Sequence, residues 1–144
     1  GKIICVGLNY HDHCREQGLE PPTYPMLFSK FANAVADPGA PVTRPRATEK
    51  LDLECELAIV IGRRASAIGR DQAGDAIFGY TILNDVSDRD FQFNHGGQWF
   101  KGKSADTFCP LGPWLVTPDE VPEDGGKARA RKGVLGRTPP FPPS

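Results

Sequence analysis

The positions of apolar residues predict a chain built mainly from short strands. Residues 2–7, KIICVG, and 26–31, MLFSKF, are short apolar runs that read as strands. Residues 51–62, LDLECELAIVIG, begin with strict alternation and end in a continuous apolar run. We therefore expect a strand with a polar face at its start and with both faces buried at its end. Residues 80–92 predict a buried strand that passes into a polar loop near Asn84, and residues 111–117, LGPWLVT, predict one more strand.

Helical signals are fewer and weaker. A short helix or helical lid is expected from about Tyr10 to a stop at Gly18, and residues 71–79 carry apolar residues at helical spacing up to Gly79. The 16 glycines and 14 prolines predict many turns and few long helices. The fold class expected is α+β and rich in β-structure, with short helices.

The chain divides into two parts of different composition. At 144 residues the chain is long enough for one domain with a real core, and residues 1–122 would form it. Residues 123–144 are basic and rich in proline, and we expect them to be disordered. The five positive charges there are more often simply solvated than bound to nucleic acid or anionic lipid.

Composition excludes several classes of protein. The formal net charge of −1 gives no general attraction to nucleic acid or membrane, and no apolar run is long enough to span a bilayer. No signal peptide is visible, so we expect a protein that is not secreted. The four cysteines lack zinc spacing and favour no disulfide pairing, which makes free thiols the expectation.

Residues 97–104 match the phosphate-binding pattern G-x-x-x-x-G-K-S, but their context argues against it. A phosphate loop needs an apolar strand before it and a helix after it. Here DRDFQFN precedes the match, and Pro110 and Pro113 soon follow it. Lys103 therefore needs another role.

Three carboxylates form a candidate metal site. Glu54 and Glu56 alternate with apolar residues, so they share one face of a strand. Asp85 ends the next buried strand. Three carboxylates without a nearby Cys or His suit a hard cation, Mg²⁺ or else Mn²⁺ or Ca²⁺. The alternative is a strand face exposed to water, and the Glu54–Glu56 pair taken alone favours that alternative.

His13 and Glu16 form a candidate general base. Three residues apart on a helix, they share a face, and a carboxylate partner orients an imidazole and raises its basicity. An exposed ion pair is the commoner meaning of this pattern. His11 and His95 are expected to be surface histidines.

The order of these motifs resembles the fumarylacetoacetate hydrolase family. E-x-E is followed by NDVS-x-RD-x-Q and then by GKS-x-DTFCPLGP. The matching segments cover nearly everything from Lys2 to about Pro122: KIICVGLNYHDHCREQ, PMLFSKF, LDLECELAIVIGRRA, GYTILNDVSDRDFQ and GQWFKGKSADTFCPLGPWLVTPDEV.

The resemblance implies a fold and a set of roles. The fold would be part of a mixed β-sheet roll. Glu54, Glu56 and Asp85 fall on metal-ligand positions, and His13 and Glu16 on the dyad that activates water. Lys103 matches a lysine that stabilises developing negative charge, and Gln92 a polar substrate contact.

The implied activity is metal-dependent hydrolysis of C–C bonds in small 2-oxo or β-diketo acids of the acylpyruvate type. Decarboxylation or isomerisation of similar enolisable acids is the close alternative. Members usually form homodimers and occur in mitochondria and in the cytosol, so either compartment is implied here.

Two departures from the family matter. Ala105 stands where a phenylalanine is usual, and the motif resemblance ends near Pro122, before the second half of the family's domain. Unpaired sheet edges would then be exposed, and we expect a marginally stable chain with weak or no activity. The alternative function is a truncated, non-catalytic relative that binds a metal or a full-length partner.

Overall fold

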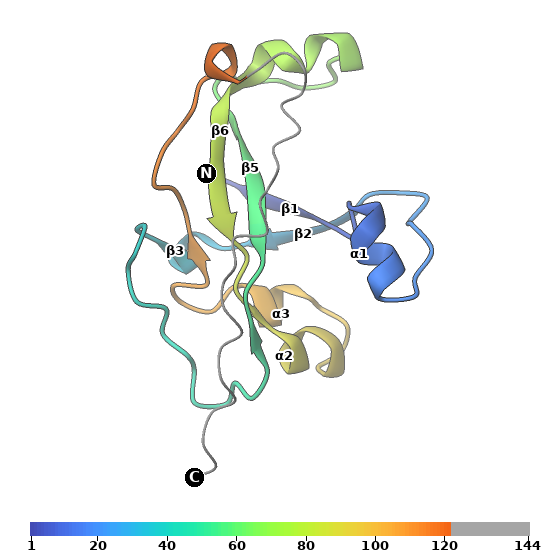
Figure 1. The fold of residues 1–144 in the computed structure, drawn as a ribbon, viewed down its shortest axis with the longest axis vertical. Coiled ribbons are helices and arrows are strands. Elements are labelled where there is room, and N and C mark those ends of the chain that lie inside the picture. The colour runs from blue at the N-terminus through green and yellow to red at the C-terminus, as the bar shows by residue number, and fades with distance from the viewer. Residues whose placement is uncertain (122–144) are drawn as a thin grey trace.

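The computed structural model describes residues 1–121, and the expected disordered tail at 123–144 lies outside the described residues (Figure 1). Short strands dominate, as the sequence predicts. The strands are β1 (Ile3–Gly7), β2 (Met26–Lys30), β3 (Val35–Ala36), β4 (Leu51–Asp52), β5 (Cys55–Ile61), β6 (Ile77–Asn84), β7 (Ser87–Asp88) and β8 (Cys109–Pro110). The α-helices are α1 (His11–Glu16), α2 (Arg89–Asn94) and α3 (Phe100–Lys103), and the 3-10 turns are η1 (Ala32–Ala34), η2 (Arg70–Gln72), η3 (Gly74–Ala76) and η4 (Pro118–Glu120).

The strands pair two by two in the described part of the chain. β1 pairs with β2, β4 with β7 and β5 with β6, all antiparallel, whereas β3 and β8 run parallel. Figure 1 shows β5 and β6 as a long pair along the long axis of the molecule, with α2 and α3 near one end of it. This arrangement confirms the α+β, strand-rich fold class.

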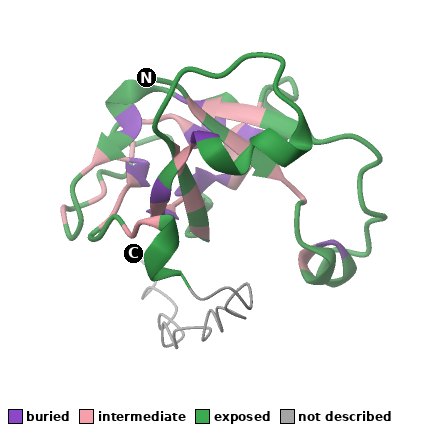
Figure 2. Cartoon of the chain, turned by 90° about the horizontal axis from the view of Figure 1, so that it is seen from above, coloured by how far each residue is buried: buried purple, intermediate pink, exposed green. Residues whose placement is uncertain are grey.

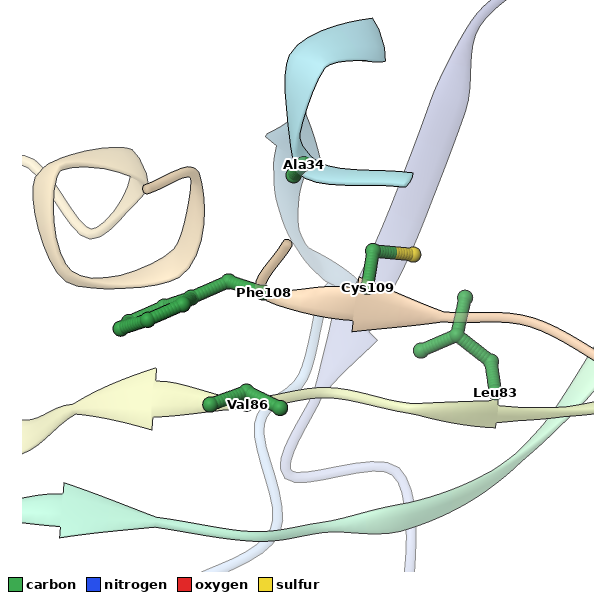
Figure 3. Close-up of a cluster of buried hydrophobic side chains, with 5 residues drawn as sticks. All are labelled: Ala34, Leu83, Val86, Phe108 and Cys109. Atoms are coloured by element: carbon green, nitrogen blue, oxygen red, sulfur yellow. The ribbon is translucent and has the colours of Figure 1, made fainter. Parts of the chain in front are cut away.

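A small core forms where the end of β6, the start of β8 and η1 meet. Its buried members are Ala34, Leu83, Val86, Phe108 and Cys109 (Figure 3). The amide of Val86 donates to the carbonyl of Phe108 at 3.2 Å, which ties the two segments together. The chain that follows β6 is thereby fixed against residues more than twenty positions later.

Three local predictions are wrong. The long strand expected over residues 51–62 is split into β4 and β5, and the carbonyl of Glu54 at the break accepts from the amide of Asp85 at 2.8 Å. Residues 71–79 form two 3-10 turns and the start of β6 instead of a helix, because β6 pairs with β5 as far as Ile77. Residues 111–117 make only isolated bridges to β6, at Leu111 and Val116.

The polar segment after Asn84 is not a surface loop. Asp85, Ser87 and Asp88 are buried, and the Asp88 carboxylate caps α2 by accepting from the amides of Asp90 and Phe91. An aspartate before a helix is a common capping residue, so a local signal for this helix was present.

The two faces of β5 are buried in the opposite way to what their polarity suggests. The glutamate side of the strand is partly covered, whereas Leu57, Ile59 and Ile61 are exposed. The expectation that the end of this strand is buried on both faces is therefore wrong for the described residues. No helix within residues 1–121 has the length and apolar character to cross a membrane.

Candidate active site

Lys103 lies buried at the end of α3, between two of the predicted metal-ligand carboxylates. Its Nζ donates to Glu54 Oε2 at 2.6 Å and to Asp85 Oδ2 at 2.8 Å, and it lies 5.0 Å from the centre of the Phe28 ring. Only 2% of its side chain is exposed. The residues before the match form the helix α2 in place of a strand, and no α-helix follows Ser104 in the described part of the chain, so the phosphate-loop match is accidental.

Lys30, at the end of β2, is a site residue that sequence reasoning missed. Its Nζ lies 2.7 Å from Asp85 Oδ1, and it donates to the carbonyl of Val86 at 3.1 Å and to the carbonyl of Lys103. Burial lowers the pKa of Lys30, and the neighbouring Asp85 opposes that shift. The available signal was a single lysine inside the apolar run MLFSKF, since lysine is almost never buried unless it is paired.

Glu54 is held in its charged form by two cations. Arg89 donates to Glu54 Oε1 at 2.6 Å, and Lys103 holds the other oxygen. Burial alone would raise the pKa of Glu54, but hydrogen bonds from Lys103 and Arg89 outweigh burial and lower the pKa to about 2.

Arg89 connects Glu54 to the surface and to Gln92. It bonds Asp52 Oδ2 at 2.7 Å through Nη2, and its Nη1 donates to Gln92 Oε1 at 2.8 Å. The side chain of Gln92 is buried on α2, so in this structure it orients Arg89. Its predicted contact with substrate stays a prediction.

Glu56 is the carboxylate of this group that has no partner. Within residues 1–121 its side chain makes no ion pair or hydrogen bond. Burial raises its pKa, and the negative charges of Glu54 and Asp85 raise the pKa further. The three predicted ligands therefore influence one another electrostatically, which argues against a strand face simply washed by water.

The donor set fits a hard divalent cation in chemistry but not in its present arrangement. Carboxylate oxygens are the ligands such cations prefer, and a second positive charge would relieve the unpaired Glu56. However, no three His, Cys, Asp or Glu side chains among residues 1–121 are gathered so that they could hold an ion. The ammonium of Lys103 lies between Glu54 and Asp85, so a metal at these residues stays a prediction.

The structure does not bring His13 and Glu16 together. The Nε2 atom of His13 lies 2.8 Å from Nε2 of Gln17, one turn further along α1, and Glu16 is exposed. Figures 1 and 2 both show α1 to one side of the molecule, beyond the ends of β1 and β2. The predicted dyad therefore lies apart from the carboxylates in this arrangement.

The remaining histidines and cysteines behave as expected. His11 is exposed, and His95 is a surface residue stacked on Phe91 and 3.0 Å from Asp90. All four cysteines are free thiols. Burial raises the pKa of Cys5 to about 12, with Asp85 adding to the shift, so this thiol near the site is a poor nucleophile.

The order and placement of these residues can be set beside known proteins. The family profile described as "Fumarylacetoacetate (FAA) hydrolase C-terminal" matches residues 2–134. The chain belongs to the fumarylacetoacetate hydrolase family. The match runs past Pro122, where the motif resemblance ends.

Several relatives in this family have been described or solved. Oxaloacetate tautomerase fahd2, mitochondrial, of Xenopus laevis is 48% identical over 121 residues, which are 83% of this chain and 38% of that protein. The 5-carboxymethyl-2-hydroxymuconate delta-isomerase of Mycobacterium smegmatis superposes with a TM-score of 0.72 at 46% identity, over 81% of this chain and 46% of that one.

A third relative carries a hydrolase name. The fumarylacetoacetate hydrolase of Exiguobacterium antarcticum superposes with a TM-score of 0.73 at 43% identity, over 82% of this chain and 43% of that one. The chain thus spans less than half the length of these relatives. Their names are those of enzymes: a tautomerase, an isomerase and a hydrolase.

Proposed function

We propose that this chain carries the enolate-stabilising part of an enzyme site for small 2-oxo or β-diketo acids. The observation that supports it best is Lys103, a buried ammonium held 2.6 Å and 2.8 Å from two carboxylates. A fixed positive charge in a water-poor site stabilises an oxyanion more than the same charge in water does.

The reactions named for the relatives share an enolate. Tautomerisation and isomerisation form it when a base takes a proton from the carbon beside a carbonyl, and C–C cleavage forms it when the bond to that carbon breaks. Lys103 would carry out the same task in each case. Glu54, Glu56 and Asp85 would hold a divalent cation, whose charge would polarise the carbonyl of a bound 2-oxo acid.

Lys30 and Arg89 would prepare this site without touching the substrate. Lys30 holds Asp85 from the buried side, and Arg89 holds Glu54 from the opposite side. Each carboxylate thus has one oxygen fixed by a supporting cation and the other directed to Lys103. Such fixed geometry is what electrostatic stabilisation of a transition state requires.

Hydrolysis and proton transfer place different demands on His13. Cleavage of an acylpyruvate-type acid needs a base that deprotonates water, and the proposed base would be His13 with Glu16. His13 contacts Gln17 instead, within its own helix. Tautomerisation or isomerisation does not need this water, so the observed arrangement favours proton transfer over C–C hydrolysis.

The test measures turnover by the purified chain with Mg²⁺ in two assays. One monitors the loss of enol absorbance of oxaloacetate, and the other monitors cleavage of an acylpyruvate. Lys103→Met should lower kcat/KM about a hundredfold, as for removal of an oxyanion donor. The exposed Lys101→Met should leave it unchanged. His13→Ala should abolish cleavage but spare tautomerisation.

A second candidate is a non-catalytic member of the family, which is supported by the contact of His13 with Gln17 in place of a contact with Glu16. Binding of Mg²⁺ measured by calorimetry without turnover of either acid would support this candidate. Turnover that persists in Lys103→Met would contradict the enolate proposal.

A further inference from the structure

The oxygens that a divalent cation would use already face cations of the chain itself. Glu54 Oε1 lies 2.6 Å from Arg89 Nη2, and Glu54 Oε2 lies 2.6 Å from Lys103 Nζ. Asp85 Oδ1 lies 2.7 Å from Lys30 Nζ, and Asp85 Oδ2 lies 2.8 Å from Lys103 Nζ. Within residues 1–121, Lys103 is therefore the cation that bridges both carboxylates.

An ammonium and a divalent cation that use the same two oxygens repel each other. Hard cations bind carboxylate oxygens at about 2.0–2.6 Å, and the Lys103 ammonium lies 2.6 Å and 2.8 Å from the same atoms. Like charges at such spacing interact strongly where little water screens them, and only 2% of the Lys103 side chain is exposed. We therefore expect the two cations to exclude each other.

The charges around the site favour exchange of one cation for the other. Four carboxylates and three positive side chains meet here: Asp52, Glu54, Glu56 and Asp85, with Lys30, Arg89 and Lys103. With all of them ionised, the group carries one net negative charge. Replacing Lys103 by a divalent cation makes the group neutral, whereas adding that cation beside Lys103 leaves an excess positive charge. Exchange thus leaves no uncompensated charge, and such charges are costly when buried.

Of the three positive side chains, Lys103 has the fewest other bonds to lose. Lys30 also donates to two backbone carbonyls, and its side chain is fully buried. Arg89 also bonds Asp52 and Gln92. In the part of the chain that the structure describes, the Nζ atom of Lys103 donates to the two carboxylates alone.

The exchange requires movement of the Lys103 side chain but not of its backbone. The carbonyl of Lys103 accepts from Lys30, and the preceding residue, Gly102, packs against the backbone of α2. The centre of the Phe28 ring lies 5.0 Å from Lys103 Nζ, and an aromatic face is a favourable neighbour for an ammonium. The flexible stem of a lysine side chain allows such a turn.

We propose that Lys103 is an exchangeable counter-ion, which holds Glu54 and Asp85 until a divalent cation binds there and then releases both carboxylates. This inference rests on the cation of the proposed function and adds how that cation enters. Release leaves the three N–H donors of the ammonium available to an oxyanion. Binding of the cation would thereby also make Lys103 ready for the enolate.

The first test measures the affinity of the full chain for Mg²⁺ by calorimetry. Lys103→Met removes the competing ammonium and should tighten Mg²⁺ binding by roughly tenfold or more, because no buried pair has to be broken. The exposed Lys101→Met removes the same charge two residues earlier and should leave the affinity unchanged. Equal affinity of the wild-type chain and Lys103→Met would overturn the proposal.

The second test needs no variant and separates exchange from repulsion at a distance. The wild-type chain is treated with acetic anhydride, with saturating Mg²⁺ or with a chelator, and the acetylation of each lysine is measured by mass spectrometry. Lys103 should react roughly tenfold faster with Mg²⁺, because its ammonium leaves the two carboxylates. Lys30 should stay protected in both conditions, and Lys101 should react in both.

The outcomes distinguish this inference from the proposed function. Binding of Mg²⁺ while Lys103 stays protected would overturn the exchange and leave the proposed enolate site standing. Failure of both the wild-type chain and Lys103→Met to bind Mg²⁺ would overturn the cation of the proposed function and the exchange with it. Binding by Lys103→Met alone would support the exchange, since the ammonium would then hold the oxygens against Mg²⁺.

Discussion

At the scale of single residues, the site is a chain of alternating charges. Lys30 contacts Asp85, Asp85 contacts Lys103, Lys103 contacts Glu54, and Glu54 contacts Arg89. Buried ion pairs add little net stability over apolar residues, but removal of one partner leaves an uncompensated charge. Such a chain is therefore better suited to positioning charged groups than to stabilising the fold.

The first prediction concerns Lys30. Lys30→Met should lower the free energy of unfolding by about 3–5 kcal/mol, because Asp85 loses a buried cation and two carbonyls lose their donor. Urea unfolding followed by circular dichroism measures this. Lys2→Met, on the exposed first residues, is the control and should leave the midpoint unchanged. Equal midpoints for the two variants would contradict the buried pairing.

The second prediction uses the opposite pKa shifts of the two glutamates. The pKa of Glu54 is lowered to about 2, so its stabilising contribution is complete above its ordinary value of 4.5 and is lost as pH falls toward 2. Burial and the neighbouring carboxylates raise the pKa of Glu56, so its charged form destabilises the metal-free protein at pH 7.

Glu54→Gln should therefore destabilise the chain at pH 7, and Glu56→Gln should stabilise it in the presence of a chelator. Both differences should shrink as pH falls, that of Glu56→Gln while pH falls through the raised pKa of Glu56 to its ordinary value of 4.5, and that of Glu54→Gln between 4.5 and about 2. Urea midpoints measured from pH 7 to pH 2 test the signs. If both variants changed the urea midpoint at pH 7 in the same direction, the charge arrangement would be wrong.

At the scale of elements, α2 and α3 place the site. The carboxylate of Asp88 caps the start of α2. The four-residue α3, which carries Lys103, packs against β2 and β7. The two helices meet at Gly102, where an added Cβ would lie 2.7 Å from the amide nitrogen of Gln92 and against the carbonyl of Asp88. Only a glycine allows this approach of two backbones.

The third prediction follows from that contact. Gly102→Ala should separate α3 from α2, lower the unfolding midpoint and remove turnover together, because Lys103 is the next residue. Gly74→Ala, whose added Cβ would meet nothing within 4 Å, is the matched control and should be neutral. Thermal unfolding measures both variants, and a Gly102→Ala protein as stable as the control would exclude a close helix contact.

At the scale of the whole molecule, buried side chains are few and exposed apolar ones are many. Figure 2 shows buried positions gathered near the centre, with long exposed stretches around them. The core cluster holds five buried members, of which Phe108 is the largest. A core of this size is expected to stabilise a fold only marginally, and the marginal stability expected from the sequence stays a prediction.

The fourth prediction separates the core from the exposed apolar face of β5, formed by Leu57, Ile59 and Ile61. Phe108→Ala should cost about 3–5 kcal/mol of stability. Ile59→Lys, on this exposed face, should change stability by no more than about 0.5 kcal/mol and should raise solubility. Urea unfolding and the saturation concentration measure the two effects. A large loss of stability in Ile59→Lys would show that this face is covered within the chain itself.

Local patterns were sufficient for most strands. Alternation and apolar runs predicted β1, β2, β5 and β6. The three carboxylates were singled out from their positions on the strands, whereas the roles of Lys103 and Gln92 came from the resemblance to the family, and all of these roles stay predictions. The helix expected over residues 71–79 was wrong, because pairing with β5 outweighs a weak helical spacing. Lys30 was missed, because a lysine gives no local sign of the acid that it will meet.

The sequence by itself determined which segments are extended, where aspartate can begin a helix, and which acids and lysines are available, because these depend on neighbours along the chain. Only the tertiary structure decided which of them meet. Lys30 and Asp85 are fifty-five positions apart, and their pairing depends on how β2, β6 and α3 pack. The same packing left Glu56 unpaired, kept His13 with Gln17, and turned the apolar side of β5 outward.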